Sequence, residues 1–171
     1  MNLKSKPDKK YITKDIYYFD NILPIDFIDN LYYKVLYDSS WAMHRSSDED
    51  SNFFWALSLE ENYSEETEFL TKYIEGNKPL RFYVNGQSGP QHGNFHEDDG
   101  ERTYLLGLSK DWLGVEQGGA TEFLLNDDVT FSVYPIYNRL LSFPSHIPHR
   151  ALPNIKFEGF RMTLAIKTEL A

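Results

Sequence analysis

The feature that most restricts the fold is a succession of short apolar segments between residues 80 and 167. Each segment has the length and composition of a β-strand, and turns containing Gly, Pro, Asn or Asp separate them. Short strands that alternate with turns are typical of antiparallel barrels and jelly rolls. The predicted strands lie at residues 80–84, 103–108, 120–125, 129–134, 139–143 and 160–167.

The first half of the chain predicts helices that support this β-rich part. Pro24 opens a segment in which apolar residues recur at helical spacing from Ile28 to Leu36. Ser64 has the character of an N-cap for a second helix, which ends before Gly76. Two further strands are predicted at residues 16–19 and 53–57. We therefore expect a mostly β fold, a jelly roll with an N-terminal helical buttress.

The chain of 171 residues has the length of one domain, and we expect residues 1–171 to form it. Within it, residues 1–13 are predicted to be a flexible tail and residues 80–168 the jelly-roll core. Residues 46–52, SSDEDSN, predict an acidic loop. Residues 85–94, NGQSGPQHGN, predict a loop that is long for a compact domain, and such loops are often lids.

Composition excludes several kinds of function. The chain has no cysteine, so disulfides, zinc–thiolate sites and thiol nucleophiles are excluded. A net charge of −9 is the opposite of the basic surface that nucleic acids require. It would favour a basic protein partner, although a solvated acidic surface is the simpler explanation. The sequence lacks a signal-peptide pattern and a stretch of transmembrane length, which predicts a soluble cytoplasmic protein without a membrane partner.

His96 and Asp98 are the first candidate metal ligands. Residues two apart on a strand point to the same face, so the imidazole and the carboxylate would share one space, with Glu97 pointing away. A His-x-Asp pair alone is a weak signal, since a solvated turn explains most such pairs. The segment RLLSFPSHIPHRALP offers a third ligand in His146 or His149. Two histidines and one carboxylate with open positions are typical of non-haem Fe(II) oxygenases.

A second candidate site lies in the segment RMTLAI. Its alternation places Arg161 and Thr163 on one face of a strand and Met162, Leu164 and Ile166 on the other. An arginine inside a barrel needs an anionic partner, which a dicarboxylate ligand would supply, with the threonine hydroxyl as an additional donor. A surface salt bridge near the start of the strand is the alternative interpretation.

These motifs resemble those of a known family. The chain contains, in this order, FYVNGQ, FHEDDGERTYLLGL, KDW, GGATEF, YNRLLSFPS, HR and RMTLAI. The same order is similar to that in the 2-oxoglutarate- and Fe(II)-dependent oxygenases, specifically their prolyl 4-hydroxylase-like branch. YYFDNILPIDFIDNL also resembles the family's N-terminal strand and helix, so the resemblance spans roughly residues 16–168. It implies a double-stranded β-helix, a cupin-like jelly roll of two facing sheets with iron in its mouth.

The resemblance implies three metal ligands, His96, Asp98 and His149. We prefer His149 to His146 as the third because His149-Arg150 leads into a Pro-containing turn, as the distal histidine of the family commonly does. His146 would then lie near the site or on the surface. The resemblance implies no catalytic side chain beyond the iron centre.

The resemblance also implies a site for the co-substrate. Arg161 and Thr163 match the Arg-x-Thr pattern that holds the far carboxylate of 2-oxoglutarate, and Tyr83 matches a tyrosine whose hydroxyl reaches the same carboxylate. Some relatives place a tyrosine near positions 106–107, where this chain has Leu-Gly. The second hydroxyl contact therefore has no evident source.

The activity implied is that of a dioxygenase that uses Fe(II), 2-oxoglutarate and O2, with ascorbate as an additional reductant, and forms succinate and CO2. The expected substrate is a prolyl residue in a protein or peptide. The same chemistry on a free amino acid or another small metabolite is the alternative, and a non-catalytic metal-binding jelly roll is a third interpretation. The loop at 85–94 should border the mouth, with Trp41, Trp55 and Trp112 in or near segments that would frame it.

Overall fold

In the computed structural model, residues 7–45, 53–156 and 158–171 are described, and they form two β-sheets and two α-helices. The predicted acidic loop at 46–52 lies outside the described residues, as do residues 1–6 of the predicted tail. None of the helices in the described part has the length and apolar character needed to cross a bilayer.

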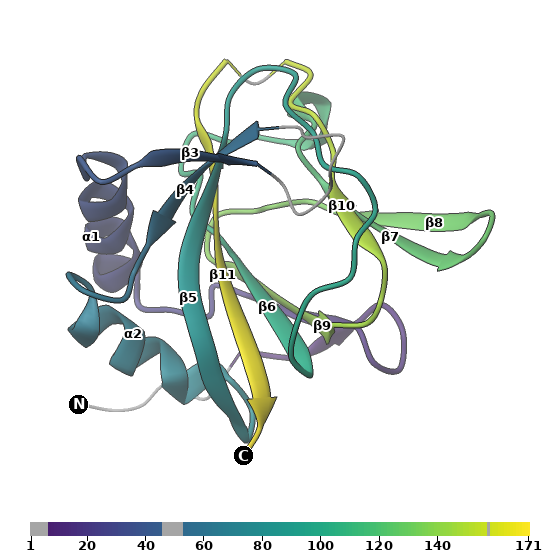
Figure 1. Cartoon of the computed structure of the whole chain (residues 1–171), viewed down its shortest axis with the longest axis horizontal. Coiled ribbons are helices and arrows are strands. Elements are labelled where there is room, and N and C mark those ends of the chain that lie inside the picture. Colours follow the sequence, from purple (N-terminus) through teal and green to yellow (C-terminus); the bar gives the residue numbers. More distant parts are fainter. Residues whose placement is uncertain (1–6, 46–52, 157) are drawn as a thin grey trace.

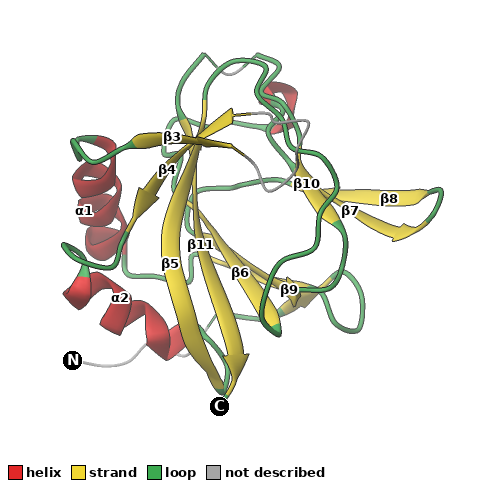
Figure 2. Ribbon diagram, in the orientation of Figure 1, coloured by secondary structure: helices red, strands yellow, loops and turns green. Residues whose placement is uncertain are grey.

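The larger sheet has eight strands in the order β1-β2-β9-β6-β11-β5-β4-β3, and all neighbours pair antiparallel (Figure 2). Strands β11 and β5 form the longest pairing, at the centre of the sheet. The strand bounds are β1 Lys10–Tyr11, β2 Tyr17–Asp20, β3 Ala42–Arg45, β4 Phe53–Ser58, β5 Asn77–Gln87, β6 Arg102–Gly107, β9 Arg139–Pro144 and β11 Arg161–Leu170.

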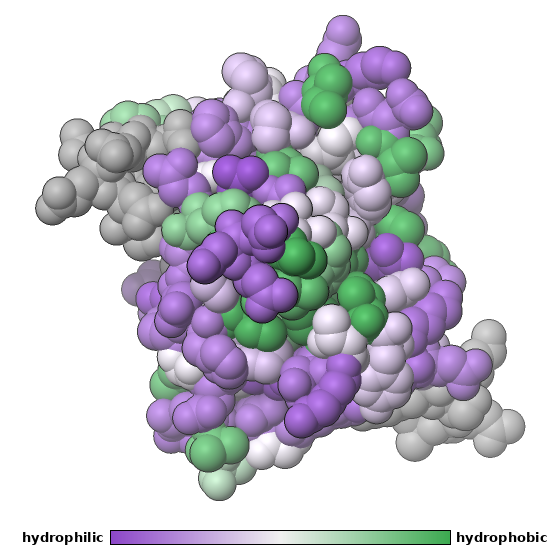
Figure 3. All heavy atoms as spheres, turned by 90° about the vertical axis from the view of Figure 1, so that its right-hand side faces the viewer, coloured by the Kyte–Doolittle hydropathy of each residue, from purple (hydrophilic) through white to green (hydrophobic). Residues whose placement is uncertain are grey.

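The smaller sheet faces the larger one and contains three strands in the order β10-β7-β8. They are β7 (Thr121–Asn126), β8 (Val129–Val133) and β10 (His149–Ala151). The β7–β8 hairpin projects from the body of the molecule (Figure 1). Seen from that side, the surface intersperses apolar and polar side chains (Figure 3). Leu125 of β7 and Val129 of β8 are exposed.

The helices cover the outer face of the larger sheet. Helix α1 (Ile25–Leu36) buries the predicted stripe of Ile28, Leu31 and Val35, and α2 (Ser64–Leu70) continues into a 3₁₀ turn at Thr71–Tyr73. This apolar layer packs against alternate residues of the central strands, and the members on those strands are Phe82, Val84, Tyr104, Leu106, Met162, Leu164 and Ile166. A second, smaller cluster joins the sheets and contains Ile16, Phe123, Val133, Leu141 and Phe143.

Strand β11 shows how one segment serves two sides of the sheet. Met162, Leu164 and Ile166 belong to the helix-side core, as the alternation predicts. The intervening Arg161, Thr163 and Lys167 line a cavity of about 730 Å³. The sheet therefore carries its core on one face and its polar cavity on the other.

The structure departs from the predicted loop at 85–94. Strand β5 continues to Gln87, because the residues from Asn85 to Gln87 pair with β11 despite the glycine among them. Gln91 secures what remains of the loop, donating a hydrogen bond to the carbonyl of Phe53 at 2.7 Å and accepting one from the backbone N–H of Ser88 at 2.7 Å. The loop is shorter and more tightly held than its glycine and proline content suggests.

The remaining strands agree with the prediction to within a few residues at each end, and the mostly β jelly roll with helical buttress is confirmed. Strands β3 and β10 were not expected. Residues 10–11, within the predicted tail, pair with β2 as β1.

Candidate metal centre

The site begins with a backbone pairing between two histidines. His96 donates its N–H to the carbonyl of His149 at 3.0 Å and accepts the N–H of His149 at 3.0 Å. The pairing is an isolated antiparallel bridge, and the ring centroids lie 4.6 Å apart. Because the two backbones are joined, both imidazoles are presented from neighbouring positions on the same wall of the cavity.

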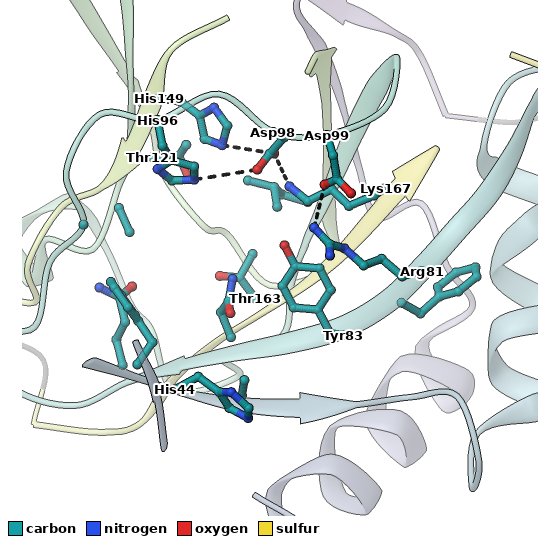
Figure 4. A pocket seen from close by; sticks show the side chains of 18 of the residues that line it. His44, Arg81, Tyr83, His96, Asp98, Asp99, Thr121, His149, Thr163 and Lys167 are labelled. Atoms are coloured by element: carbon teal, nitrogen blue, oxygen red, sulfur yellow. Dashed lines mark hydrogen bonds and ion pairs between the residues drawn. The ribbon is translucent and has the colours of Figure 1, made fainter. Parts of the chain in front are cut away.

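Asp98 completes a cluster with these histidines. Its N–H donates to the carbonyl of Ser145 at 2.9 Å, which holds its backbone beside the turn that precedes β10. Its carboxylate oxygens lie 3.2 Å from Nε2 of His149 and 3.7 Å from Nε2 of His96 (Figure 4). The three ligand atoms are all within 4.8 Å of one another, and no other such group of His, Asp or Glu occurs among the described residues.

Backbone carbonyls fix the orientation of both imidazoles. Nδ1 of His96 lies 3.0 Å from the carbonyl of Asn94, and Nδ1 of His149 lies 2.9 Å from the carbonyl of Ile147. A carbonyl only accepts, so each Nδ1 carries a proton and each Nε2 faces Asp98 and the cavity. Metal-binding histidines usually show this arrangement, with the second ring nitrogen donating to the protein.

Burial and charge set the protonation of the cluster. Burial on its own would raise the pKa of Asp98, but the contacts with His149 and Lys167 outweigh it and hold this pKa well below its ordinary value. Burial lowers the pKa of His96, and the neighbouring His149 lowers it further. Asp98 is therefore ionised and His96 neutral near neutral pH, the forms that a metal ion requires.

The other histidines lie apart from this cluster. His146 is exposed in the turn before β10, and His92 is exposed in the loop after β5. His44 is exposed on β3 at the rim of the cavity. Of the two candidates in SHIPHR, the structure thus places His149 beside Asp98 and turns His146 to solvent.

Arg161 lies at the other end of the cavity, and its side chain is 2% exposed. Nη1 donates to Oε1 of Gln87, the residue opposite it on β5. Its Nε and the hydroxyl of Thr163 have no hydrogen-bond partner among the described residues. Burial lowers the pKa of Arg161 to about 10, so the guanidinium stays charged. A buried guanidinium whose Nε is unpaired, beside a buried hydroxyl that is also unpaired, fits a ligand carboxylate.

A glycine makes room for this arginine. Gly119 has φ +73°, and a Cβ at this position would lie 2.6 Å from Oδ1 of Asn154 and 2.9 Å from Cδ of Arg161. Gly107 shows a comparable constraint, since a Cβ there would lie 2.3 Å from the carbonyl oxygen of Ile136. The position where some relatives have a tyrosine therefore has no space for a side chain.

Tyr83 points into the cavity nearer to the metal cluster than to Arg161. It pairs with Ala165 on β11, whereas Arg161 pairs with Gln87. Nζ of Lys167 lies 5.9 Å from the centre of its ring. Burial, with a smaller contribution from Asp98, raises the pKa of Tyr83, so its hydroxyl is a neutral donor. Figure 4 shows this hydroxyl beside Thr163, pointing toward Lys167 and Asp98.

Two cavity residues were missed by sequence reasoning. Lys167 contacts Asp98, and the alternation that placed Arg161 and Thr163 on one face also places Lys167 there. The sequence predicts a loop at Gln87, and no local signal identifies this residue as the partner of Arg161. The predicted aromatic frame also differs, because Trp112 is buried with its indole N–H on the carbonyl of Gly118 at 3.0 Å.

No model of a known protein family matches the chain, and no curated protein sequence matches it. Solved structures do match. A prolyl-4-hydroxylase from Pseudomonas putida has a TM-score of 0.73 at 17% identity, over 93% of this chain and 94% of that one. A prolyl hydroxylase from Trichoplax adhaerens, in complex with a hypoxia inducible factor oxygen degradation domain peptide fragment, has a TM-score of 0.74 at 15% identity, over 92% and 84%.

A third matching structure is of a protein that is described by a different reaction. The non-haem α-ketoglutarate-dependent carbocyclase SnoK from nogalamycin biosynthesis has a TM-score of 0.73 at 10% identity, over 98% of this chain and 88% of that one. At such low identities the likeness concerns the fold. The predicted resemblance is confirmed at that level: the chain has the jelly-roll fold shared by prolyl hydroxylases and other 2-oxoglutarate- and Fe(II)-dependent oxygenases.

Proposed function

We propose that the protein is an Fe(II)- and 2-oxoglutarate-dependent dioxygenase. The observation that carries this proposal is the pairing of two groups in one cavity: the His96, Asp98 and His149 cluster, and a buried Arg161 without a carboxylate partner among the described residues. Two imidazoles and one carboxylate suit Fe(II) with open positions. The buried guanidinium would bind the far carboxylate of a dicarboxylate co-substrate. A simple metal-binding module would not need such a buried arginine.

Each residue has a specific task in this proposal. His96 and His149 hold the metal through Nε2, and Asp98 holds it through its carboxylate. Bound Fe(II) supplies the redox chemistry by which substrate, 2-oxoglutarate and O2 become hydroxylated substrate, succinate and CO2. Ascorbate would serve as an accessory reductant. The protein contributes positions and charges, and no side chain is required as an acid or base.

The co-substrate would lie along the inner face of β11. Arg161 and Thr163 are well placed to bind its distal carboxylate, through a charge-assisted hydrogen bond and a hydroxyl donor. Tyr83 donates its hydroxyl from β5 on the side nearer the metal. These three residues border a cavity of about 730 Å³, which is larger than a five-carbon diacid needs. The remaining volume is available to a substrate.

For the substrate, we propose a prolyl residue in a protein or peptide. The cavity is bordered by β3, β4 and the loop after β5, which together offer polar side chains and backbone to an extended segment. The Trichoplax adhaerens prolyl hydroxylase, which has the same fold, is described in complex with a peptide fragment. The net charge of −9 would favour a basic protein.

A small metabolite is the second candidate, and one observation favours it. Gln91 fastens the loop after β5 to β4 and to Gln87, so this side of the entrance is braced by hydrogen bonds. A fixed rim suits a ligand that is enclosed as a whole. Proteins of this fold include SnoK, which is described as a carbocyclase from nogalamycin biosynthesis.

The deciding experiment has two stages. Purified protein with Fe(II) and 2-oxoglutarate should form succinate, and omission of iron or substitution of His96, Asp98 or His149 should abolish it. Mass spectrometry of a proteome digest and of a metabolite extract, each incubated with the complete system, then identifies which mixture gains an oxygen atom. Absence of iron-dependent succinate formation would refute the dioxygenase proposal, and oxidation confined to metabolites would refute the prolyl assignment.

A further inference from the structure

A lysine adjoins the metal cluster from the centre of the larger sheet. Lys167 lies on β11, on the same face as Arg161 and Thr163, and is 2% exposed. Its Nζ contacts Oδ2 of Asp98 and lies 3.4 Å from the hydroxyl of Thr103. A fully buried lysine is uncommon unless it is paired, and the partner here is one of the three candidate metal ligands.

The two oxygens of Asp98 have different surroundings. Oδ2 accepts a hydrogen bond from the hydroxyl of Thr103 at 2.7 Å and contacts Nζ of Lys167, and Nε2 of His149 lies 3.2 Å from it. Oδ1 accepts no hydrogen bond from the described part of the chain, and Nε2 of His96 lies 3.7 Å from it. An ionised oxygen that already has two donors offers little further electron density, so Oδ1 is the oxygen left for a metal ion.

The choice of oxygen affects how many metal positions remain open. A carboxylate that binds through one oxygen uses one position, and one that binds through both uses an additional position. In the proposed reaction the co-substrate and O2 need the remaining positions, so a second bond from Asp98 would interfere with one of them. Donors fixed on Oδ2 prevent that bond.

The charge of Lys167 does not itself favour metal binding. Lys167 places a positive charge within a few ångströms of the cluster, where it opposes the arrival of a dication. Its presence therefore does not strengthen metal binding through charge. Lys167 instead fixes the orientation of the Asp98 carboxylate. It contacts Oδ2 from β11, while Thr103 contacts the same oxygen from β6.

We propose that Lys167 is a positioning residue for the metal centre: with Thr103 it holds Oδ2 of Asp98, so that the carboxylate binds the metal through Oδ1 alone. The inference rests on the proposed metal site and extends it to residues outside the cluster of three. Outer partners of metal ligands typically affect metal affinity or activity by about 10- to 100-fold.

The test uses Lys167→Met, which keeps an unbranched side chain but removes the charge and the donors. Thr103→Val removes the other donor to the same oxygen from a different strand. Lys78→Met is the matched control, because Lys78 is an exposed lysine on β5 that pairs with Glu169 of β11, away from the cavity. The full chain is loaded with Co(II), whose visible spectrum reports coordination number, and succinate formation is measured with Fe(II).

We expect Lys167→Met to change the Co(II) spectrum and to lower succinate formation about 10- to 100-fold. The Co(II) dissociation constant should not rise, because the repelling charge is gone. Thr103→Val should change the spectrum in the same direction, and it carries the test if Lys167→Met does not fold. Lys78→Met should match the unmodified protein.

Two results would overturn the inference. One is an unchanged Co(II) spectrum in both cavity variants. The other is a parallel loss of Co(II) affinity, activity and thermal stability, which would indicate a purely structural role. A different result would show that the proposed metal site itself is wrong. In that case His96→Ala would bind Co(II) as tightly as the unmodified protein, whatever the result for the lysine variants.

Discussion

His96 and His149 exchange two backbone hydrogen bonds, each 3.0 Å long, so the two candidate metal ligands are joined by their main chains before any side chain is considered. This bridge also links the segment before β6 to the start of β10 in the smaller sheet. The ligands therefore come from the smaller sheet and from the connection between β5 and β6, yet their spacing is set by a local pairing. Side-chain substitutions at these positions should leave the pairing intact, since it uses only backbone groups.

The first prediction follows from this separation of backbone and side chain. His149→Ala should abolish Fe(II)-dependent succinate formation and Co(II) binding, because two ligands hold the metal poorly. Its free energy of unfolding should fall only by about 0.5–3 kcal/mol, the range of ordinary substitutions. Far-UV circular dichroism and denaturant titration measure the fold. Loss of the native spectrum would contradict the idea that the bridge survives.

The second prediction contrasts the two histidines of SHIPHR. His146 is exposed, so His146→Ala should retain most of the activity and bind Co(II) like the unmodified protein. The measurement is a pair of titrations, His146→Ala beside His149→Ala under the same conditions. The reverse result, with turnover lost in His146→Ala and kept in His149→Ala, would show that the assignment of His149 as the third ligand is wrong.

The third prediction concerns Arg161. Removal of one partner from a buried, charge-assisted pair costs about 2–5 kcal/mol, or about 30- to several-thousandfold in affinity. Arg161→Ala should raise the 2-oxoglutarate concentration needed for half-maximal succinate formation by a factor in this range, with Co(II) affinity little changed.

Arg81→Ala is the matched control for that measurement. Arg81 borders the same cavity but is about half exposed, and it pairs with Asp99 at 2.5 Å. A solvated pair of this kind contributes little, so the 2-oxoglutarate requirement should stay within a few-fold of the unmodified value. Equal effects of the two substitutions would argue against a specific anchor at Arg161.

The fourth prediction tests the space beside Arg161 without touching its charge. In Gly119→Ala the new methyl group would meet Asn154 and Arg161, and the backbone at φ +73° would be strained. We expect weaker 2-oxoglutarate binding while Co(II) binding is retained. Gly114→Ala, where no atom lies within 4 Å of an added Cβ, should behave like the unmodified protein in the same assay.

The fifth prediction addresses the substrate. Deletion of residues 88–91 removes the braced loop but keeps Gln87, the partner of Arg161. If the substrate is a peptide that lies across this rim, the deletion should impair peptide hydroxylation and leave Fe(II) and 2-oxoglutarate binding nearly intact. Competition binding of both ligands, run beside mass spectrometry of the peptide, separates the two effects.

Periodicity in the sequence was enough to predict the strands that carry the cavity. RMTLAI alternates because one face of β11 packs on the helices while the other faces the cavity, so Arg161 and Thr163 were identified correctly as cavity residues. The same rule would have found Lys167 if the pattern had been extended by one more residue. A lysine in an apolar strand is usually taken as its exposed end, and only the position of Asp98 shows otherwise.

Other features depend on contacts between distant segments. Strand β10 has three residues and is flanked by prolines, so its sequence resembles a turn, and its partner on β7 defines it as a strand. Gln87 follows a glycine and precedes Ser-Gly-Pro, which indicates a loop. The pairing with Arg161 overrides that local preference. Such residues become predictable only once the sheet order is known.

The alternation along β11 has a consequence for how this chain can change. Substitutions at Arg161, Thr163 or Lys167 alter chemistry and leave the helix-side packing in place, so new specificities can arise there without dismantling the core. Insertion or deletion of a single residue within the strand does the reverse. It would rotate every following side chain to the opposite face, placing Lys167 among the leucines and a methyl-rich surface where the ligands belong. The strand can therefore vary in content while its length is essentially fixed.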